Sequence, residues 1–493
     1  MKKLFLFYII IGGLLLNSCK DFLDLPPKNQ RAVTTLDDVK SVLAGYLDAF
    51  ARSNTRPIVG PSPIVTEAQS MMFEAYADNF DFEANMGQYI NTMNIHAQER
   101  FYANKLLFND TETPDYIWNN YYAAVGFLNA LNDQCDELKE ADPNELKRVK
   151  GEILVHRAYY IFKLQQYFAP MDNEELGIPL YLHTGKEVVG VQMKRKKSTE
   201  IYAVITDDLK LALDYYQTAG PNQGYSRFFN DRYIQNLLAQ VYWFKAESSA
   251  GHIEDYTEAK KYALAAIEGT DAYIPKTLLE FQNVQRNLNS QYPAVYLESL
   301  AFGTVAPIYG SNLDYLGFSP NNLKIPADFY NSFDSNDLRK AAYFNGTVMS
   351  SNWPDGLAPI QKYVRIHLFT PEEAYLILAE SYYRTSQPDQ ALATLNKFKV
   401  FRGATEKNLS GAALLEEIIS ERRKEFFCDT DKRWLDLKRY KIGTITRNLK
   451  FFNKDYTIKV EPGDYHYALP IPLAELQENP DMVPNGGWNP IVF

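Results

Sequence analysis

The densest set of charged residues lies near the C-terminus, in the runs E-R-R-K-E-F-F at 421–427 and R-W-L-D-L-K-R at 433–439. On a helix Glu421 and Glu425 share one face, and two neighbouring carboxylates can act as a general acid and a general base. The alternative is structural, because arginine forks pair with carboxylates and could tie the last helix to a loop carrying Trp434. No histidine or metal-binding set accompanies the runs, which favours a structural network. Its members would be Glu421, Arg422, Glu425, Arg433, Trp434, Asp436 and Arg439.

Other catalytic motifs are missing from the sequence. The 6 histidines form no H-E-x-x-H zinc pair, and there is no G-x-S-x-G, G-x-x-x-x-G-K or C-x-x-C motif. The sequence therefore does not favour an enzyme, and we expect no catalytic residues, no metal site and no cofactor. Glycosidase carboxylates come from distant positions in a chain, so a cell-surface glycoside hydrolase stays open as an alternative.

The N-terminus has the layout of an export signal. Two lysines precede an apolar run over residues 4–16, which is shorter than the roughly 20 residues that span a bilayer as a helix. The sequence L-N-S-C at 16–19 resembles a bacterial lipobox, in which the cysteine sulfur carries a diacylglycerol. An ordinary secretory signal with an incidental cysteine is the alternative. We expect a lipoprotein signal peptide over residues 1–18, lipidation of Cys19, and a tether over residues 19–33.

Composition narrows the classes of partner. The chain has 493 residues and a formal net charge of −10, which argues against nucleic acid or anionic lipid as the main partner. Hydrophobic residues make up 46% and charged residues 23%, as in ordinary globular proteins. Besides Cys19 only Cys135 and Cys428 occur. Two cysteines cannot build a disulfide framework, so both are expected to be buried thiols.

Apolar residues recur at intervals of three and four over most of the chain, which predicts amphipathic helices. Thr199 is expected to be an N-cap, and Thr370, Pro371 and Glu373 predict a helix start with a capping box. Ala379 and its counterpart Ala391 would let two antiparallel helices approach closely, as in tetratricopeptide repeats. The predicted fold class is therefore all-α, built on helix pairs. The predicted helices cover residues 36–50, 65–76, 116–138, 146–168, 199–216, 233–248, 256–267, 370–384 and 389–399.

Two long stretches, 77–113 and 271–369, lack a clean helical period and mix aromatic residues with asparagine. Irregular stretches of this length in a compact domain are usually functional or disordered, and the aromatic content makes disorder less favoured. For 271–369 the sequence favours short strands and loops over helices. The chain therefore divides into a helical scaffold and two aromatic, asparagine-rich insertions.

Four further stretches, taken with the lipobox, resemble the SusD/RagB-like family of outer-membrane nutrient-binding lipoproteins of Bacteroidetes. The matching stretches are the signature at 421–439 (E-R-R-x-E-F…R-W-x-D-L-x-R), the helix pair at 374–403, the ending at 467–487 (P-I-P…N-P…N-G-G) and the R-A-x-x-Y…P-L segment at 157–180. Two positions depart from the family pattern. Residues 428–432 replace a glycine-containing turn, and Pro484 stands where a glutamine is usual. Both touch scaffold rather than ligand.

The resemblance implies four tetratricopeptide-like helix pairs and a lipid anchor in the outer membrane, with the body facing the extracellular side. It implies a SusC-like TonB-dependent transporter as the partner. The ligand would be an oligosaccharide or, on the RagB side of the family, a peptide. We expect one domain over 34–493, made of a helical part (34–270), an irregular ligand face (271–369) and a signature part (370–493).

In this family the ligand contacts come from the irregular insertions. Sugars stack their C–H faces on aromatic rings, while amide and carboxylate groups bind their hydroxyls. The ligand-binding candidates are Tyr89, Phe101, Tyr102, Asn104, Phe302, Tyr309, Asn312 and Tyr315, with Trp353 as a further exposed-aromatic candidate. For each ring the alternative is a place in the core. Tryptophan is scarce in both insertions, which keeps the peptide ligand open.

Overall fold

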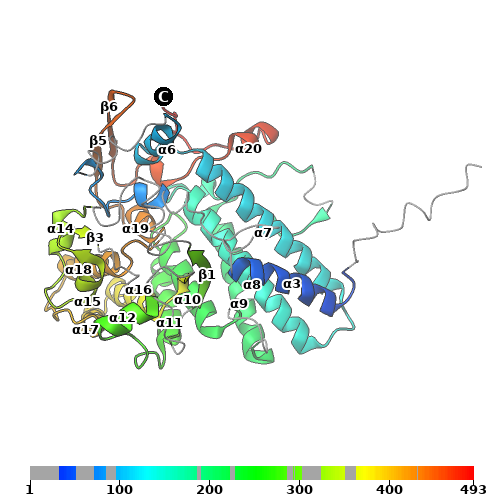
Figure 1. Cartoon of the computed structure of the whole chain (residues 1–493). Helices are drawn as coiled ribbons and strands as arrows, with labels where there is room; N and C mark the ends of the chain where they lie inside the picture. Colours follow the sequence, from blue (N-terminus) through cyan, green and yellow to red (C-terminus); the bar gives the residue numbers. More distant parts are fainter. Residues whose placement is uncertain are drawn as a thin grey trace, which may run out of the picture.

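Figure 1 shows the computed structural model, in which helices dominate, as the all-α prediction requires. It describes residues 33–51, 72–84, 96–185, 190–221, 228–285, 292–293, 295–301, 324–349, 362–429 and 431–493. The expected signal peptide, Cys19 and nearly all of the tether lie outside these residues. Within these ranges, no helix is both long enough and apolar enough to cross a membrane.

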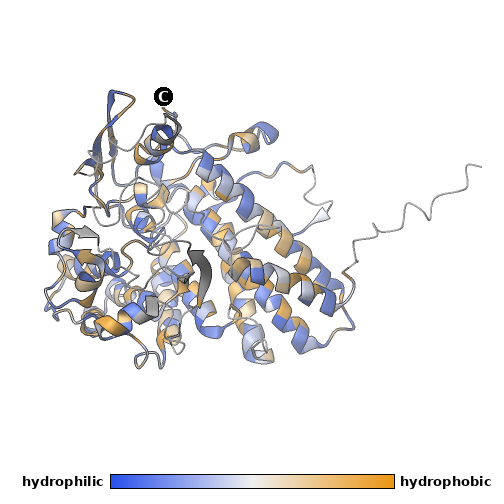
Figure 2. Ribbon diagram, viewed as in Figure 1, coloured by the Kyte–Doolittle hydropathy of each residue, from blue (hydrophilic) through white to orange (hydrophobic). Residues whose placement is uncertain are grey.

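The N-terminal half is built on long helices. They are α3 (Leu36–Ala51), α7 (Glu112–Glu137), α8 (Pro143–Phe168) and α9 (Ser198–Ala219). Helix α8 packs against both α7 and α9. It begins at Asp142, whose carboxylate accepts a hydrogen bond from the Glu145 N–H at 2.8 Å, and Pro143 occupies the first turn. Figure 2 shows apolar and polar residues sharing the same helices, as expected for amphipathic elements that cover a core.

Two helix pairs carry the predicted repeat. They are α10 (Asp231–Lys245) with α11 (Ile253–Ile267), and α16 (Pro371–Arg384) with α17 (Pro388–Phe401). Helix α11 also packs on α16, so the pairs are stacked. Ala379 and Ala391 are fully buried in one apolar cluster with Leu395, which confirms the predicted close approach of α16 and α17.

The C-terminal signature forms two helices, α18 (Ala412–Glu425) and α19 (Lys432–Tyr440). The expectation that a loop carries Trp434 is wrong, because Trp434 lies within α19 and is fully buried. A helix forms here because α19 is inserted into the core, with every residue from Arg433 to Arg439 buried. Cys135 and Cys428 are buried and free, as predicted.

The described parts of the two insertions contain strands and also helices. The strand pairs are β1 (Val295–Ala301) with β4 (Lys362–Phe369) and β2 (Phe344–Asn345) with β3 (Val348–Met349), both antiparallel. The helices are α6 (His96–Leu106), α12 (Leu278–Gln285), α14 (Ala327–Asn331) and α15 (Leu338–Tyr343). The short strands predicted for 271–369 are confirmed, whereas the helices in both stretches differ from the prediction. Short helices gain most of their stability from tertiary contacts, which a periodic pattern does not reveal.

The end of the chain adds a hairpin that the sequence analysis did not predict. Strands β5 (Ile445–Phe451) and β6 (Lys454–Val460) pair antiparallel, and residues along β5 alternate between buried and exposed. The chain then passes through the 3₁₀ turn η5 (Tyr465–Tyr467) and helix α20 (Leu473–Glu478). A second 3₁₀ turn, η2 (Glu174–Leu176), precedes α9.

Two predicted helix starts differ in detail. Helix α9 begins at Ser198, and the Thr199 hydroxyl donates to Glu174 at 2.7 Å instead of capping the helix. Helix α16 has Pro371 in its first turn as predicted, but the Thr370 side chain makes no cap hydrogen bond. Glu373, the expected capping-box partner, instead accepts hydrogen bonds from basic side chains of α18 and α19. A charge-assisted bond of this kind is stronger than a neutral cap bond.

Candidate functional site

The charged residues of α18 lie in a buried network that joins it to α15 and α17. Arg339 of α15 is fully buried, and its guanidinium donates to Asp337 at 2.7 Å, Glu421 at 2.6 Å and Glu425 at 3.2 Å. Lys399 of α17 donates to Glu421 at 3.0 Å. Three helices are therefore fixed to one another by charge-assisted hydrogen bonds.

A second part of the network fixes α16 to α18 and α19. Arg422 donates to Asp436 at 2.7 Å and to Glu373 at 3.0 Å. Arg402 donates to Glu372 at 2.7 Å and to Glu425 at 2.7 Å. The first residues of α16 thus accept hydrogen bonds from the guanidinium groups of Arg402, which follows α17 directly, and of Arg422 in α18.

A third part surrounds Glu380 at the centre of α16. Arg439 donates to both of its oxygens at 3.1 Å, the Trp243 indole donates at 2.5 Å, and the Tyr440 hydroxyl donates at 2.6 Å. Burial would raise the pKa of Glu380, but Arg439 and then Arg384 outweigh it and hold that pKa at about 2. Glu380 therefore stays ionised in the core.

The geometry of the network does not suit acid–base chemistry. Burial alone would raise the pKa of Glu421, but the cations around it, first among them Arg339, hold it well below the ordinary range. A general acid or base must also reach its substrate, and the Glu421 side chain is fully buried. In the ranges that the structure describes, no three His, Cys, Asp or Glu side chains gather to hold a metal ion.

Helix α6 carries three of the predicted ligand-binding residues. Phe101 is half-buried, with the Lys105 ammonium 4.6 Å from its ring centroid. Tyr102 is only 5% exposed and packs in the core, which leaves little of its ring for a ligand. The Asn104 side chain accepts a hydrogen bond from the Asn109 amide at 2.9 Å. Tyr89, Phe302, Tyr309, Asn312, Tyr315 and Trp353 lie outside the described residues and stay predictions.

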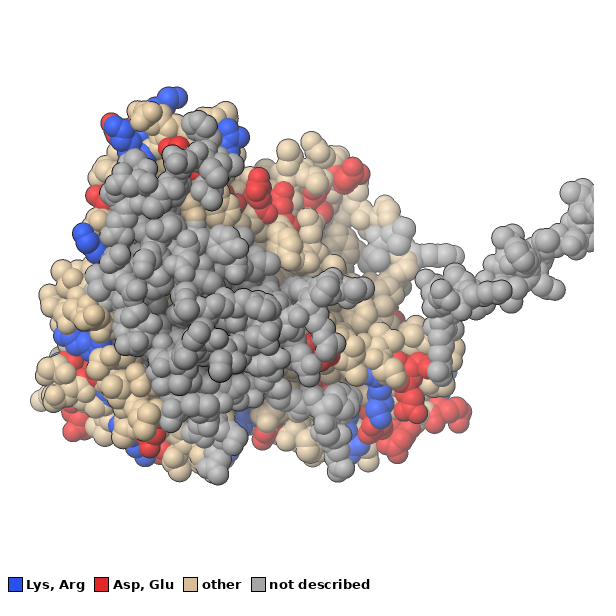
Figure 3. All heavy atoms as spheres, in the orientation of Figure 1, with Lys and Arg blue, Asp and Glu red and all other residues tan. Residues whose placement is uncertain are grey.

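Helix α6 is fastened to the end of the chain. Arg100 donates to the carbonyl of Phe493 at 3.3 Å, and Asn109 donates to the carbonyl of Ile491 at 3.0 Å. Figure 1 shows α6, the β5–β6 hairpin and the C-terminus together at one end of the molecule. We call α6, the hairpin, η5 and residues 485–493 the C-terminal corner. In Figure 3 basic side chains lie over the hairpin and acidic ones over α20, so a ligand near this corner meets both signs of charge.

An exposed aromatic ring is fixed firmly within this corner. Tyr465 is 41% exposed, and its ring stacks on His466 with centroids 3.9 Å apart. Trp488 meets the same ring edge-on at 5.8 Å. Gly487 lies so close that a Cβ atom there would be 2.5 Å from the ring, which explains the glycine. A ring held in this way is ready to stack on a ligand with little loss of conformational entropy.

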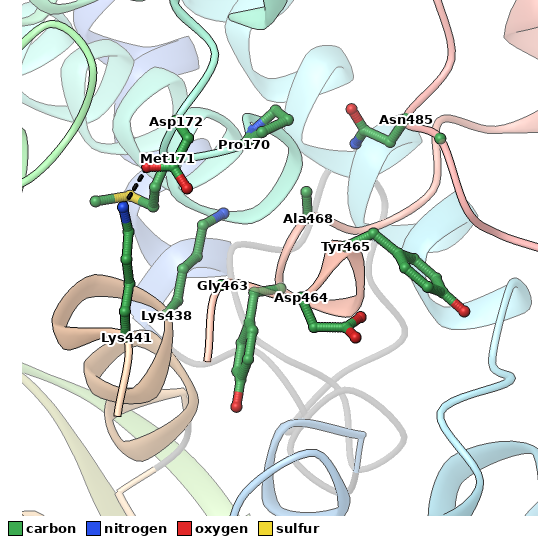
Figure 4. Close-up of a pocket in the computed structure, with 12 residues that line it drawn as sticks. Pro170, Met171, Asp172, Lys438, Lys441, Gly463, Asp464, Tyr465, Ala468 and Asn485 are labelled. Atoms are coloured by element: carbon green, nitrogen blue, oxygen red, sulfur yellow. Dashed lines mark hydrogen bonds and ion pairs between the residues drawn. The ribbon is translucent and has the colours of Figure 1, made fainter. Parts of the chain in front are cut away.

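A cavity of about 170 Å³ opens beside this ring (Figure 4). On one side Lys441 forms an ion pair with Asp172, and the Lys438 side chain extends toward the same wall. Asp464 and Tyr465 lie on the other side. Because whole pockets for drug-sized ligands are about 300–1,000 Å³, this cavity suits one small polar unit.

Residues 170–172, which directly follow α8, line the same cavity, and Lys438 joins them to the end of that helix. Lys438 is buried and donates to the carbonyls of Gln166 at 2.6 Å and Ala169 at 2.7 Å. Arg195 donates to the carbonyl of Phe168 at 3.1 Å. These carbonyls carry the partial negative charge of a helix C-terminus, which attracts cations. Burial lowers the pKa of Lys438 well below its usual value, and Arg195 adds to that effect.

Together, the Tyr465 ring, the Asp464 carboxylate and the Lys441–Asp172 ion pair can bind a small polar ligand without covalent chemistry. Sequence analysis missed Tyr465 as a candidate, although the aromatic run Tyr465-His466-Tyr467 directly precedes the P-I-P motif. The signal was local, but nothing in the sequence placed this run beside α6.

Comparison with known families agrees with the motifs. Residues 373–488 match the model of the SusD family, and residues 21–242 match a model described as starch-binding and associating with the outer membrane. Together the two models cover about two thirds of the chain. A search of curated proteins finds no match.

Solved structures share the fold along nearly the whole chain. A SusD-like carbohydrate binding protein from Bacteroides vulgatus has a TM-score of 0.65 and 17% identity, covering 91% of this chain and 97% of its own. A SusD superfamily protein from Bacteroides thetaiotaomicron has a TM-score of 0.62 and 21% sequence identity, and the match covers 92% of this chain and 100% of that protein. Surface glycan-binding protein A from Bacteroides uniformis has a TM-score of 0.62 and 15% sequence identity, and the match covers 92% of this chain and 99% of that protein. Signature motifs, family models and fold agree, and the chain belongs to the SusD/RagB family of glycan-binding proteins associated with the outer membrane.

Proposed function

We propose that this protein is a surface-exposed lipoprotein that captures oligosaccharides and hands them to a SusC-like TonB-dependent transporter. The observation that carries the proposal is the match of residues 21–242 to a family model described as starch-binding and associating with the outer membrane. The lipobox ending at Cys19 supplies the anchor, with the body facing outward. Binding is non-covalent, and the energy for transport comes from the transporter system.

The C-terminal corner supports a sugar ligand. Phe101 and Tyr465 are aromatic residues with exposed surface, and Asp464 offers a carboxylate beside the small cavity. Aromatic faces combined with a few polar groups suit sugars, which expose apolar C–H faces and hydroxyls. Two of the structural relatives are described as a carbohydrate binding protein and a surface glycan-binding protein. We extend that class of ligand to this chain.

Calorimetry on the full chain in detergent micelles tests the ligand class. Maltooligosaccharides and a panel of other glycans are titrated beside a mixture of peptides, and the solutions are then analysed for products. We expect saturable binding of a glycan without turnover, weakened by Phe101→Ala or Tyr465→Ala. Binding of peptides alone would instead identify a peptide-capturing RagB-like protein. Release of shorter sugars would identify a hydrolase.

The anchor and the partner are tested in cells. Cys19→Ala should give a folded, glycan-binding protein that no longer fractionates with the outer membrane. Affinity purification of the unmodified lipoprotein should recover a TonB-dependent barrel encoded nearby. Unchanged membrane fractionation of Cys19→Ala would contradict the anchor, and absence of the barrel would contradict the hand-off.

A further inference from the structure

A second cavity, of about 280 Å³, lies between α14, α18 and α19, apart from the C-terminal corner. We call it the α18 groove. Asp328 and Glu416 are exposed at its rim, and Arg423 and Arg433 are largely buried at its floor. Ser332, Ser420, Phe329, Ile419 and Ile442 complete the lining.

The two arginines of the α18 groove share a single carboxylate. Arg433 donates through Nε and Nη2 to the two Asp78 oxygens, at 2.6 and 2.8 Å. Arg423 donates through Nη2 to the Asp78 carbonyl at 2.6 Å, and that nitrogen is 3.4 Å from the Asp78 carboxylate. Two cations therefore share one anion at the floor, while the carboxylates of Asp328 and Glu416 lie at the rim.

Several N–H groups at this floor have no acceptor among the described residues. The Nε of Arg423 is buried without a hydrogen-bond partner. The Nη1 groups of Arg423 and Arg433 likewise make no hydrogen bond to the part of the chain that the structure describes. Only the buried Nε carries the free-energy cost of an unpaired donor, whereas the two Nη1 groups are not among the buried unpaired atoms and can bind water or a ligand with acceptor atoms.

The Arg423 guanidinium is held in place by an aromatic ring. It lies over Phe329 of α14, 4.2 Å from the ring centroid, which fixes the plane of the group. Burial lowers the pKa of Arg423 to about 10, although Asp78 opposes this. For Arg433, in contrast, Asp78 and the hydrogen bonds to it outweigh burial and raise the pKa. Asp78 accepts two side-chain hydrogen bonds from Arg433 and none from Arg423, on which Asp78, Asp328 and Glu74 act only through charge.

We propose that the α18 groove binds the anionic group of an acidic saccharide, a carboxylate or a sulfate ester. The oxygens of such a group match the N–H donors of a guanidinium fork. Sugar hydroxyls could donate to Asp328 and Glu416, whose repulsion of the anion is screened because both are exposed to water. The cavity is close to the lower limit of about 300 Å³ for ligand pockets, so it admits one acidic sugar unit. This goes beyond the capture of neutral oligosaccharides.

Calorimetry on the full chain in detergent micelles tests this proposal with glucuronate, glucose and sodium sulfate. We expect glucuronate to bind, glucose to fail at this groove, and sulfate to displace glucuronate because the same guanidinium groups hold both. Equal binding of glucose and glucuronate would overturn the proposal. So would failure of sulfate to compete. Maltooligosaccharide binding is measured separately, so the neutral-glycan function stands or falls on its own result.

Two variants locate the site. Arg423→Gln removes the unpaired donors and should weaken glucuronate binding roughly tenfold or more. Ser420→Asp adds a negative charge to the lining, leaves both arginines in place and should weaken binding to a similar degree. Arg148→Gln removes one arginine from distant α8 and is the matched control, with unchanged affinity expected. Melting temperatures confirm folding of each variant, and a folded variant of Arg423 or Ser420 with unchanged affinity would refute the site.

Discussion

The buried network and the α18 groove use arginine in opposite ways, although both involve helix α18. Arg339 is fully buried and has three carboxylates within hydrogen-bond distance. Arg423 keeps part of its side chain exposed, and its carboxylate neighbour Asp78, 3.4 Å away, is hydrogen-bonded to Arg433 instead. The number of carboxylates around a guanidinium thus separates a group that fixes helices together from one that is left with donors for a ligand.

Two buried carboxylates, Glu380 in the network and Glu74 near the groove, differ in the direction of their pKa shifts. Glu380 in the network meets Arg439 and Arg384, and its pKa falls to about 2. Glu74, on the groove side, is buried with the Asn79 amide as its hydrogen-bond partner. Burial, reinforced by Asp429 and Asp78, raises the pKa of Glu74 to about 8. Glu380 is therefore ionised between cations, whereas Glu74 has an amide as its hydrogen-bond partner and takes up a proton more readily.

The largest expected effect comes from removing one cation of the network. Arg339→Met leaves Asp337, Glu421 and Glu425 buried with less counter-charge, and we expect a loss of about 3–5 kcal/mol in the free energy of unfolding. Urea unfolding followed by circular dichroism measures it. Arg423→Gln should cost much less, and equal losses for the two variants would erase the distinction between network and groove.

The next effect depends on pH and concerns Glu74. Its folded pKa is raised, so its contribution to stability is fully present below the unfolded value of about 4.5 and is lost as pH rises through about 8. Glu74→Gln should therefore stabilise the protein by about 2–4 kcal/mol at pH 9 and change little at pH 4. Unfolding midpoints at both pH values give the answer. A stabilisation that does not depend on pH would show that the charge of Glu74 is not its cause.

The contribution of Glu380 to stability should depend on pH in the opposite direction. Its folded pKa is lowered, so its contribution is present above about 4.5 and is lost as pH falls through about 2. Glu380→Gln should destabilise the protein by about 2–3 kcal/mol at pH 7, with a smaller difference near pH 2. The same unfolding series measures it. If this variant were as stable as the unmodified protein at pH 7, the ion pair with Arg439 would contribute nothing net.

The smallest effect concerns the C-terminal corner. Gly487 has φ +87° and a Cβ there would collide with the Tyr465 ring, so Gly487→Ala should cost about 1–3 kcal/mol. Gly463→Ala is the matched control, because Gly463 has φ +78° but open space around it. Gly463→Ala should lower the free energy of unfolding by less than Gly487→Ala and leave the Tyr465 ring in place. Equal costs would mean that the collision with Tyr465 is relieved by a small shift.

Much of the scaffold could be predicted from the sequence because its signals are local. The helices that became α7 and α8 follow from apolar periodicity, and the contact between Ala379 and Ala391 follows from residue size. Helix α6 was missed because its sequence is mostly polar and its position depends on the distant C-terminus. The run of charges around Trp434 predicts an exposed loop, but it forms a helix in which every residue from Arg433 to Arg439 is buried.

The candidate sites could be predicted less well because they depend on contacts between residues that lie far apart in the sequence. Arg423 is visible in the signature, but its partner Asp78 is 345 positions away, and no local pattern joins the two. Tyr465 lies beside a recognised motif, yet its exposure depends on the packing of His466 and Trp488. The prediction of Phe101, Tyr102 and Asn104 as ligand-binding residues rests on residue type, which does not distinguish a ring in the core from an exposed one.

Residues 72–84 are held by hydrogen bonds from residues near the C-terminus, so this segment can be completed only late in folding. Arg433 holds Asp78, and Arg447 donates to the carbonyl of Ala77 at 2.8 Å, so this early segment is secured by residues 355 and 370 positions later. Such non-local contacts form late, because closing a long loop costs entropy before the contact is gained. A chain that is synthesised from its N-terminus must therefore keep this early segment unfinished until nearly all of the chain is available. Loss of only the last sixty or so residues would leave a helical body whose N-terminal part cannot close.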